Sequence, residues 1–519
     1  MIKNFKWLVL VSLTFVACDS NDAVLDANSS DGLPLTAGSA DFSKYVALGN
    51  SLCAGYSDGA LFAAGQANSY PNILSQRFAL VGGGEFKIPY MNDNVGGLLL
   101  GGFQIQGPRL YFNGSGPATL PGTPTTEITN ILTGPFNNMG VPGAKSFHLL
   151  ASGYGNVAGV FTGQANPYFV RFASSPTTTV LADAVAQNPT FFSLWIGNND
   201  VLAYATSGGV GVNQTGSGNL PNAYGPNDIT DPAVFHNVYS TLLDGLTAGG
   251  AKGVVANIPY VTSVPFFTTV PTNPIPGLPP ASAGQLNALF GGINSALAGF
   301  GLPARFQTLV ADDGNPATVE TNPLLIKDES LLNISAQITA ALISAGYPAP
   351  TAGYIGNLYG QARHASNAAA SRDYILLTAR TIIGTTQTGA IAPFNTIGVS
   401  YPMQDNTTLT ASETAEVKAA TDAFNTSIHD LAVAKGLAFV DANATLAQVA
   451  NGGLLVSGYT MTSTYVTGNS FSLDGVHPSP KGYALIANKF LEAINTTYGS
   501  NFKGVNLGQY QILYSASLP

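Results

Sequence analysis

Four short segments contain side chains that could do chemistry together: residues 49–52 (Gly-Asn-Ser-Leu), 138–143, 197–200 (Gly-Asn-Asn-Asp) and 472–478. Between them they contain serine, histidine and aspartate, the residue types of a nucleophile, its general base and the acid that orients the base. Each segment taken alone is also typical of an ordinary turn. The interpretation therefore depends on their order and on their position after predicted strands.

Ser51, Asp474 and His477 have the properties of a catalytic triad. A serine hydroxyl is a poor nucleophile until a base removes its proton, and imidazole side chains titrate near ~6.5, which suits that task at neutral pH. Asp474 precedes His477 by three residues. In a turn or the first turn of a helix, residues at this spacing share one face, so the carboxylate can hold the ring nitrogen that is not needed by Ser51.

Apolar runs that end in turns predict the strands that position these residues. They cover residues 45–48, 191–196, 253–259 and 437–441. Helical spacing of apolar residues predicts helices over residues 70–80, 411–435 and 480–495, the second ended by Gly436. Strands separated by helices predict a parallel sheet with helices on both faces. Ligands bind at the carboxyl ends of such strands, so we expect the site in the loops after residues 48, 196 and 258.

The same pattern predicts one large α/β domain over residues 41–497, followed by a C-terminal extension over residues 498–519. Long stretches rich in Gly, Thr, Pro and Asn are interpreted as insertions at about 81–136, 205–232 and 265–403. The last contains predicted helices over residues 281–300 and 331–345. A separate domain within residues 265–403 is the alternative.

In this order and position, the segments resemble the motif blocks of the SGNH hydrolase superfamily, the GDSL-type esterases and lipases. The resemblance spans most of the chain from Asp41 to about Asn495. It implies a three-layer α/β/α, flavodoxin-like fold with a central parallel sheet and no cofactor. Ser51 matches the nucleophile, and Asp474 and His477 match the DxxH block.

The resemblance also implies an oxyanion hole made of the backbone N–H groups of Ser51 and Gly143 and the side-chain amide of Asn199. Asn199 matches the asparagine of the GxND block, whereas the choice of Gly143 competes with nearby Gly140. Removing one such donor typically costs ~3 kcal/mol in the barrier.

Three residues depart from family or related patterns. Asn50 stands where the family motif has Asp, which is not a triad member, and Asn198 stands where a smaller residue is common. Cys53 breaks the GxSxG pattern, so the nucleophile elbow of α/β-hydrolases is not met. We expect Cys53 to be a small, reduced and buried thiol.

The N-terminus is predicted to be a targeting segment. Two lysines precede an apolar stretch over residues 7–17, which is shorter than the roughly 20 residues needed to span a bilayer and fits a signal peptide over residues 1–17. Phe15-Val16-Ala17-Cys18 resembles a bacterial lipobox, which implies cleavage before Cys18 and acylation of its sulfur. We expect an exported lipoprotein anchored in the outer membrane, with a flexible tether over residues 18–40. A plain secretory signal is the alternative.

Composition excludes several function classes. The 519 residues carry a formal charge of −9, with only 9% charged side chains, so the basic face that a nucleic-acid binder needs is missing. The five histidines include no pair at the helical spacing of a zinc site, and we expect His148, His364 and His429 on the surface or on helix faces. Residues 312–315 look like a calcium loop but lack its full spacing and closing Glu. We therefore predict no metal.

The leading hypothesis is a serine esterase or lipase, a carboxylic ester hydrolase acting through an acyl-Ser51 intermediate on a lipid or an acylated glycan. Phe266 and Phe267 could line an acyl pocket or a lid, with ordinary packing as the alternative. The first competing function is a polysaccharide O-deacetylase that uses the same site. The second is a non-catalytic surface lipoprotein that binds glycan or protein.

Overall fold

A five-stranded parallel sheet forms the centre of the computed structural model, which describes residues 26–518. Its strands are β1 (Tyr45–Gly49), β6 (Asn138–Gly140), β7 (Phe191–Trp195), β8 (Lys252–Ala256) and β15 (Ala438–Val440). Their spatial order is β6-β1-β7-β8-β15, which is 2-1-3-4-5 in chain order. The direction in which the chain crosses the sheet therefore reverses between β1 and β7. The expected α/β class, with its parallel sheet, is confirmed.

Four of the five strands lie where the apolar runs predicted them, but β6 was not predicted. Residues 138–143 are, taken alone, typical of an ordinary turn. In the structure, Asn138–Gly140 pair with β1, with Ala47 opposite Asn138, and only the residues after Gly140 turn. A three-residue strand is too short to show a sequence period.

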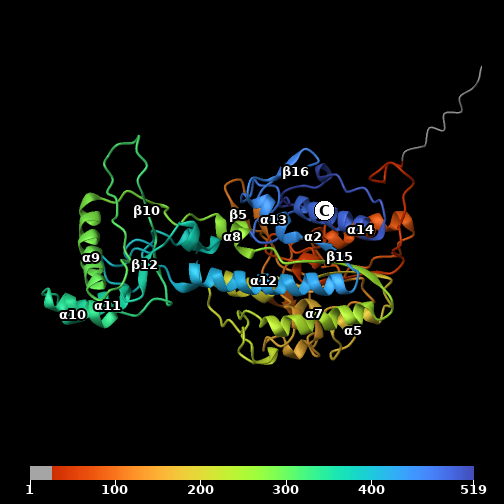
Figure 1. The fold of residues 1–519 in the computed structure, drawn as a ribbon, viewed down its shortest axis with the longest axis horizontal. Coiled ribbons are helices and arrows are strands. Elements are labelled where there is room, and N and C mark those ends of the chain that lie inside the picture. Colours follow the sequence, from red (N-terminus) through yellow and green to blue (C-terminus); the bar gives the residue numbers. More distant parts are fainter. Residues whose placement is uncertain (1–25, 519) are drawn as a thin grey trace, which may run out of the picture.

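Helices cover both faces of the sheet (Figure 1). On one face lie α3 (Tyr70–Phe78) and α14 (Pro480–Tyr498), and on the other lie α5 (Val180–Val185), α7 (Pro232–Thr247) and α12 (Ala411–Ala434). Because both faces are covered, every residue of β1 and β7 is buried. This burial explains why their sequences are continuous apolar runs and do not alternate.

Capping residues set the bounds of α12 and of α14, the helix that follows residues 472–478. Thr410 and Glu413 form a capping box that begins α12. Gly436 follows the helix with a φ of +62°, a conformation that favours glycine. Ser479 Oγ accepts the N–H of Gly482, at 3.0 Å, at the start of α14.

Residues 270–403 form a lobe that projects from one side of this body (Figure 1). It contains α9 (Pro280–Gly299), α10 (Ser335–Ser344), α11 (Ala349–Tyr359) and short two-stranded sheets. Phe290, Phe306 and Tyr359 centre a hydrophobic cluster that is distinct from the core around the main sheet. The lobe thus has its own interior.

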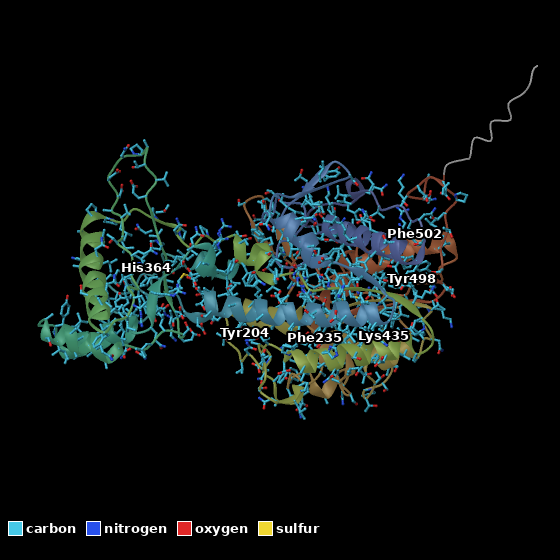
Figure 2. All side chains as sticks on the ribbon, viewed as in Figure 1. Tyr204, Phe235, His364, Lys435, Tyr498 and Phe502 are labelled. Carbon is cyan, nitrogen blue, oxygen red and sulfur yellow. The ribbon has the colours of Figure 1, made fainter. Side chains whose placement is uncertain are left out.

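His364 lies inside the lobe, where the sequence suggested a surface or helix-face position (Figure 2). It is only 4% exposed, and its Nδ1 accepts the N–H of Gln307 at 2.8 Å. It belongs to β12 (Ala362–His364), a short strand that the sequence did not reveal. His148 is half-buried, and His429 is exposed as expected.

Residues 26–40, expected to be part of a flexible tether, are bonded to the body. The N–H of Thr36 donates to Asn501 Oδ1 at 2.8 Å, and the N–H of Ser39 donates to the carbonyl of Tyr498 at 2.8 Å. These long-range bonds were invisible to composition, since the segment is polar and rich in turn residues. The predicted signal peptide and Cys18 lie outside the described residues.

The segment after α14 also packs on the body. The Arg109 guanidinium donates from Nη2 to the carbonyl of Ser515 at 2.6 Å, and the Tyr514 ring packs edge-on against Phe62 at 4.8 Å. Among residues 26–518, no helix combines the length and apolar character needed to cross a membrane.

Candidate active site

Ser51, His477 and Asp474 meet at the carboxyl end of β1. Ser51 is the first residue of α1 (Ser51–Ala54), directly after the strand, and the other two lie in the loop before α14. Ser51 Oγ is 2.9 Å from His477 Nε2, and His477 Nδ1 is 2.9 Å from Asp474 Oδ2. Side chains more than 420 positions apart in sequence therefore form one hydrogen-bonded relay. It lies beside the point where the strand order reverses, which is where open α/β sheets bind ligands.

The Asp474 carboxylate is held by four further hydrogen bonds. Its Oδ1 accepts the N–H groups of Val476 and His477, both at 2.8 Å, and the hydroxyl of Ser472 at 3.1 Å. Its Oδ2 accepts the N–H of Gly59 at 2.9 Å. Burial by itself raises the pKa of Asp474, but the adjacent His477 and these hydrogen bonds outweigh it and hold the pKa at about 2. The carboxylate is therefore ionised at neutral pH and can orient the imidazole.

The two backbone N–H groups expected in the oxyanion hole belong to Ser51, the first residue of α1, and to Gly143, in the loop after β6. In the described part of the chain, the N–H groups of Ser51 and Gly143 donate no hydrogen bond. Gly143 is exposed and has a φ of +81°. Residues other than glycine rarely adopt this backbone conformation. This geometry favours Gly143 over Gly140, which lies buried in β6.

Asn199 begins α6 (Asn199–Thr206), directly after the loop that follows β7. Its Nδ2 donates to the carbonyl of Ala144 at 2.9 Å, which uses one of its two N–H bonds. The next residue, Asp200, is fully buried and accepts both the N–H and the hydroxyl of Ser146, at 2.8 and 2.7 Å. These bonds connect the Gly143 loop to α6 and fix the proposed donors relative to each other.

The structure assigns Asp200 a positioning role that the sequence analysis missed. Burial raises its pKa, although the hydrogen bonds from Ser146 oppose that rise. In the sequence, the position of Asp200 directly after Asn199, within the Gly-Asn-Asn-Asp segment, could have indicated this role.

The two departures from the family motif contact each other. Asn50 Nδ2 donates to Asn198 Oδ1 at 3.1 Å in the interior, and Asn50 Oδ1 accepts the N–H of Leu52 at 3.0 Å. Asn50 thereby caps α1 and ties it to the loop after β7.

Asp58 is a second buried carboxyl beside the relay, and the sequence analysis did not identify it. It is 1% exposed; its Oδ1 accepts the N–H of Leu473 at 2.9 Å, and its own N–H donates to Ser472 Oγ at 3.0 Å. Burial raises its pKa to about 7, and the charge of Asp474 adds to that rise, whereas Leu473 and Arg109 lower it. It supports the loop that carries Asp474.

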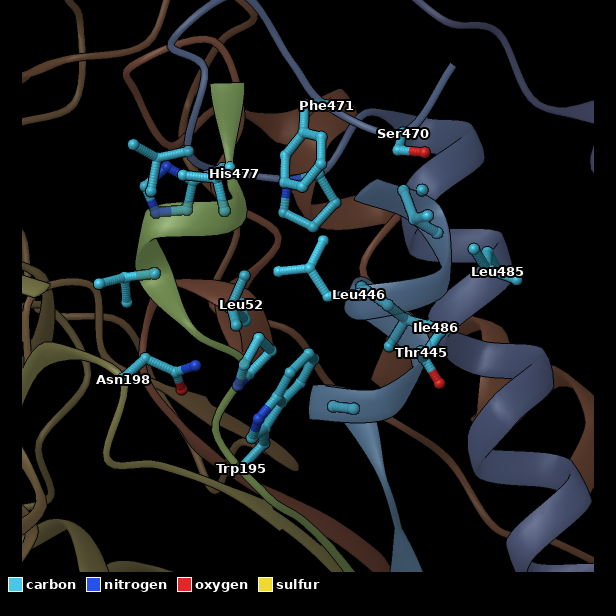
Figure 3. Close-up of a pocket in the computed structure, with 18 of the residues that line it drawn as sticks. Leu52, Trp195, Asn198, Thr445, Leu446, Ser470, Phe471, His477, Leu485 and Ile486 are labelled. Atoms are coloured by element: carbon cyan, nitrogen blue, oxygen red, sulfur yellow. The ribbon is translucent and has the colours of Figure 1, made fainter. Parts of the chain in front are cut away.

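An apolar pocket of about 130 Å³ opens beside Ser51 and His477 (Figure 3). Its walls come from β7, β15, α13 (Ala442–Ala450), α14 and the loop before His477, among other segments, and they include Trp195, Leu446, Val449, Phe471, Leu485 and Ile486. A dry apolar cavity of about 150 Å³ is large enough to hold a benzene ring. This pocket therefore has room for a small apolar group beside Ser51.

Phe266 and Phe267, considered above for an acyl pocket or lid, do not line this pocket. Phe267 is 1% exposed and packs edge-on near Tyr374, which agrees with the packing alternative. The N–H of Phe266 donates to the carbonyl of Gly475 at 2.9 Å. Helix α8 (Pro265–Thr268), at the base of the lobe, thereby supports the loop that carries His477.

Cys53 is fully buried and free, as expected. Burial raises the pKa of its thiol, which disfavours the nucleophilic thiolate. Within residues 26–518, two groups of carboxylates are close enough to share an ion, and neither lines the pocket beside Ser51. They are Asp312, Asp313 and Glu320, and Glu329, Asp405 and Glu413.

In comparisons with known proteins, no family model, no curated protein and no solved structure matches this chain.

Proposed function

We propose that this protein is a serine esterase or lipase of the SGNH type that hydrolyses carboxylic esters. The observation that carries the proposal is the continuous relay from Ser51 Oγ through His477 to the Asp474 carboxylate, with an apolar pocket at the nucleophile.

The proposed reaction has two steps. Ser51 Oγ attacks the ester carbonyl carbon while His477 Nε2 takes the hydroxyl proton, and the alcohol leaves with that proton, which forms acyl-Ser51. Water then attacks the acyl carbon while His477 again takes a proton, and the acid leaves as Ser51 regains its hydrogen. Asp474 keeps the ring oriented, and the N–H groups of Ser51, Gly143 and Asn199 stabilise the charge on the carbonyl oxygen.

The order of the sheet supports the SGNH assignment. The order 2-1-3-4-5 is that of the flavodoxin-like doubly wound fold, which the family resemblance implies. The relay lies in the loops where that fold binds its ligands. The strand order and the position of the relay therefore support the proposal.

The pocket favours esters with an apolar acyl chain over acetylated glycans. Its lining is almost entirely apolar, and burying methylene groups there stabilises the transition state for a longer chain. In a series of p-nitrophenyl esters, we expect kcat/KM to be larger for hexanoate and octanoate than for acetate. A preference for acetate, together with release of acetate from an acetylated glycan, would support the deacetylase alternative.

A fluorophosphonate probe tests the nucleophile directly. We expect one covalent adduct, located by mass spectrometry on Ser51, in the wild-type protein and none in Ser51→Ala. Absence of both labelling and ester hydrolysis in the folded wild-type protein would favour the non-catalytic alternative.

The lipid anchor is part of the proposal as well. We expect cells fed a palmitate analogue to incorporate it into the wild-type chain at Cys18 and to release a Cys18→Ala variant from the membrane fraction. Absence of the palmitate analogue from the wild-type chain, with both proteins recovered outside the membrane fraction, would leave the plain secretory signal as the better interpretation of residues 1–17.

A further inference from the structure

A second and larger concave site lies in the lobe, apart from the pocket beside Ser51. It is a groove of about 980 Å³ between α9, α10 and residues 393–400. The two cavities share no lining residue. Sites for small molecules usually measure roughly 300–1,000 Å³, so the groove has room for a whole ligand.

Small residues create this space. Ala288, Gly292 and Ala296 line the groove from α9, and Ala341 in α10 and Ala345 at its C-cap line it from the other side. Each set repeats every four residues, which puts its members on one face of the helix. A methyl group added to Gly292 would meet no atom within 4 Å. The helices therefore leave open volume along their facing sides.

The groove contains no charged residue. None of its lining residues is Asp, Glu, Lys, Arg or His, and α9, α10 and α11 contain none of these either. Two other surface cavities in the described chain differ, since one includes Asp41 and Lys252 and the other Asp422 and Asp430. A charged ligand would therefore meet no side chain of opposite charge in this groove.

The lining combines apolar walls with uncharged hydrogen-bonding groups. Leu289, Phe394 and Val399 supply apolar surface, and the amides of Gln285 and Asn395 also line the groove. Neither amide side chain forms a hydrogen bond within residues 26–518, so both are available to a ligand.

We propose that the lobe groove binds an uncharged amphiphile with a single apolar chain. The chain packs along the small-residue faces of α9 and α10, and a hydroxyl-bearing head group bonds to Gln285 or Asn395. Burial of the chain drives binding, and the lack of charge in the groove discriminates against anionic and cationic lipids. The site requires no chemistry at Ser51.

The test uses the full chain with Ser51→Ala and Leu446→Trp, which together prevent hydrolysis and fill the pocket beside Ser51. Isothermal titration calorimetry measures binding of 1-O-dodecylglycerol, an uncharged ether, below its aggregation concentration. Dodecanoate at pH 8 has the same chain length and an anionic head. We expect the ether to bind at least tenfold more tightly than dodecanoate.

Two matched pairs of substitutions locate the site. Ala341→Glu places a carboxylate in the groove, whereas Ala340→Glu is exposed on the same helix outside it. We expect Ala341→Glu to weaken ether binding at least tenfold and Ala340→Glu to leave it unchanged. Gly292→Phe against Gly291→Phe repeats the test on α9 by filling the groove.

Three results would overturn the proposal. The first is equal ether affinity in both members of each pair, and the second is binding of dodecanoate as tight as that of the ether. The third is a concentration-dependent dimer that Ala341→Glu dissociates, which would assign the groove to a second copy of the chain. Loss of esterase activity in Ser51→Ala with unchanged ether binding would separate this proposal from the proposed hydrolase.

Discussion

The body and the lobe differ in where their charged and polar side chains lie. In the body, the carboxylate of Asp474 accepts hydrogen bonds both from Val476, in its own loop, and from Gly59, in a distant segment of the chain. In the lobe, α9, α10 and α11 carry no charge, and buried ion pairs of Arg363 with Asp328 and Asp373 lie outside these helices. The comparison indicates that the body brings polar side chains from distant segments into one hydrogen-bonded network, whereas the lobe exposes an uncharged concave surface.

Asp474→Asn tests the body side of this comparison with the largest expected effect. The amide keeps the shape of the carboxylate, but its NH2 group, if placed at the Oδ2 position, accepts no hydrogen bond from either His477 Nδ1 or the N–H of Gly59. We expect kcat on p-nitrophenyl octanoate to fall by about 10⁴-fold, as is typical when the orienting acid of a triad is lost. Asp430→Asn, at an exposed site on α12, serves as the control.

A loss smaller than tenfold in Asp474→Asn would contradict the assigned role of this carboxylate. Binding of the uncharged ether in the lobe groove is expected to stay unchanged in the same variant. A parallel loss of both properties would mean that body and lobe are coupled.

Asp58→Asn tests whether a buried carboxyl group in the polar network of the body lowers the free energy of unfolding. The pKa of Asp58 is about 7 in the folded protein against an ordinary 3.8, so the folded state keeps a proton that the unfolded chain has released. The contribution of Asp58 to stability is therefore present below about pH 4 and is lost as pH rises to about 7. Relative to wild type, we expect Asp58→Asn to gain up to about 4 kcal/mol over that interval.

Urea unfolding of both proteins at pH 4, 5.5 and 8 measures this gain. Asparagine can still accept the N–H of Leu473, so the hydrogen bond to the loop of Asp474 is retained. A stability difference that stays constant across the three pH values would show that Asp58 does not hold a proton in the folded state.

Asn199→Ala tests the proposed oxyanion hole. The substitution removes a side-chain donor and leaves the carbonyl of Ala144 without its partner. We expect kcat to fall by about 10²–10³-fold with little change in KM, since the interaction forms mainly in the transition state. The reverse pattern, a raised KM with unchanged kcat, would place Asn199 in ground-state binding only.

Local sequence patterns predicted the parts of the fold that depend on local physics. The runs around Leu48 and Leu194 predicted buried strands, and Gly436 predicted the end of α12. Asp474 and His477 could be predicted as partners from the sequence because they lie within one turn of each other. The family resemblance was needed to identify Ser51.

The missed features depend on contacts between distant segments. Asp58 sits in a polar turn and acquires its role through Leu473, 415 positions away. The pairing of Asn50 with Asn198 and the bonding of Thr36 to Asn501 are equally non-local. The lobe groove forms only when α9 and α10 are packed in the folded chain. It could not be predicted, because small residues such as Gly292 and Ala341 are equally typical of an open groove and of close contact between helices.

Leu446→Trp tests whether the body, like the lobe, recognises apolar chains. If it does, the two regions differ less in the ligands that they bind. Leu446 lines the pocket of about 130 Å³ beside Ser51, and a larger ring there takes up the space that a long acyl chain needs. We expect kcat/KM for p-nitrophenyl octanoate to fall about tenfold, or ~1.4 kcal/mol, while the value for acetate stays within twofold. Gln448→Trp, exposed on the same helix and outside the pocket, is expected to change neither value. An equal loss for acetate and octanoate would mean that Leu446 supports the relay and does not select the acyl chain. In that case, the lobe groove would be the better candidate for lipid recognition within the described chain.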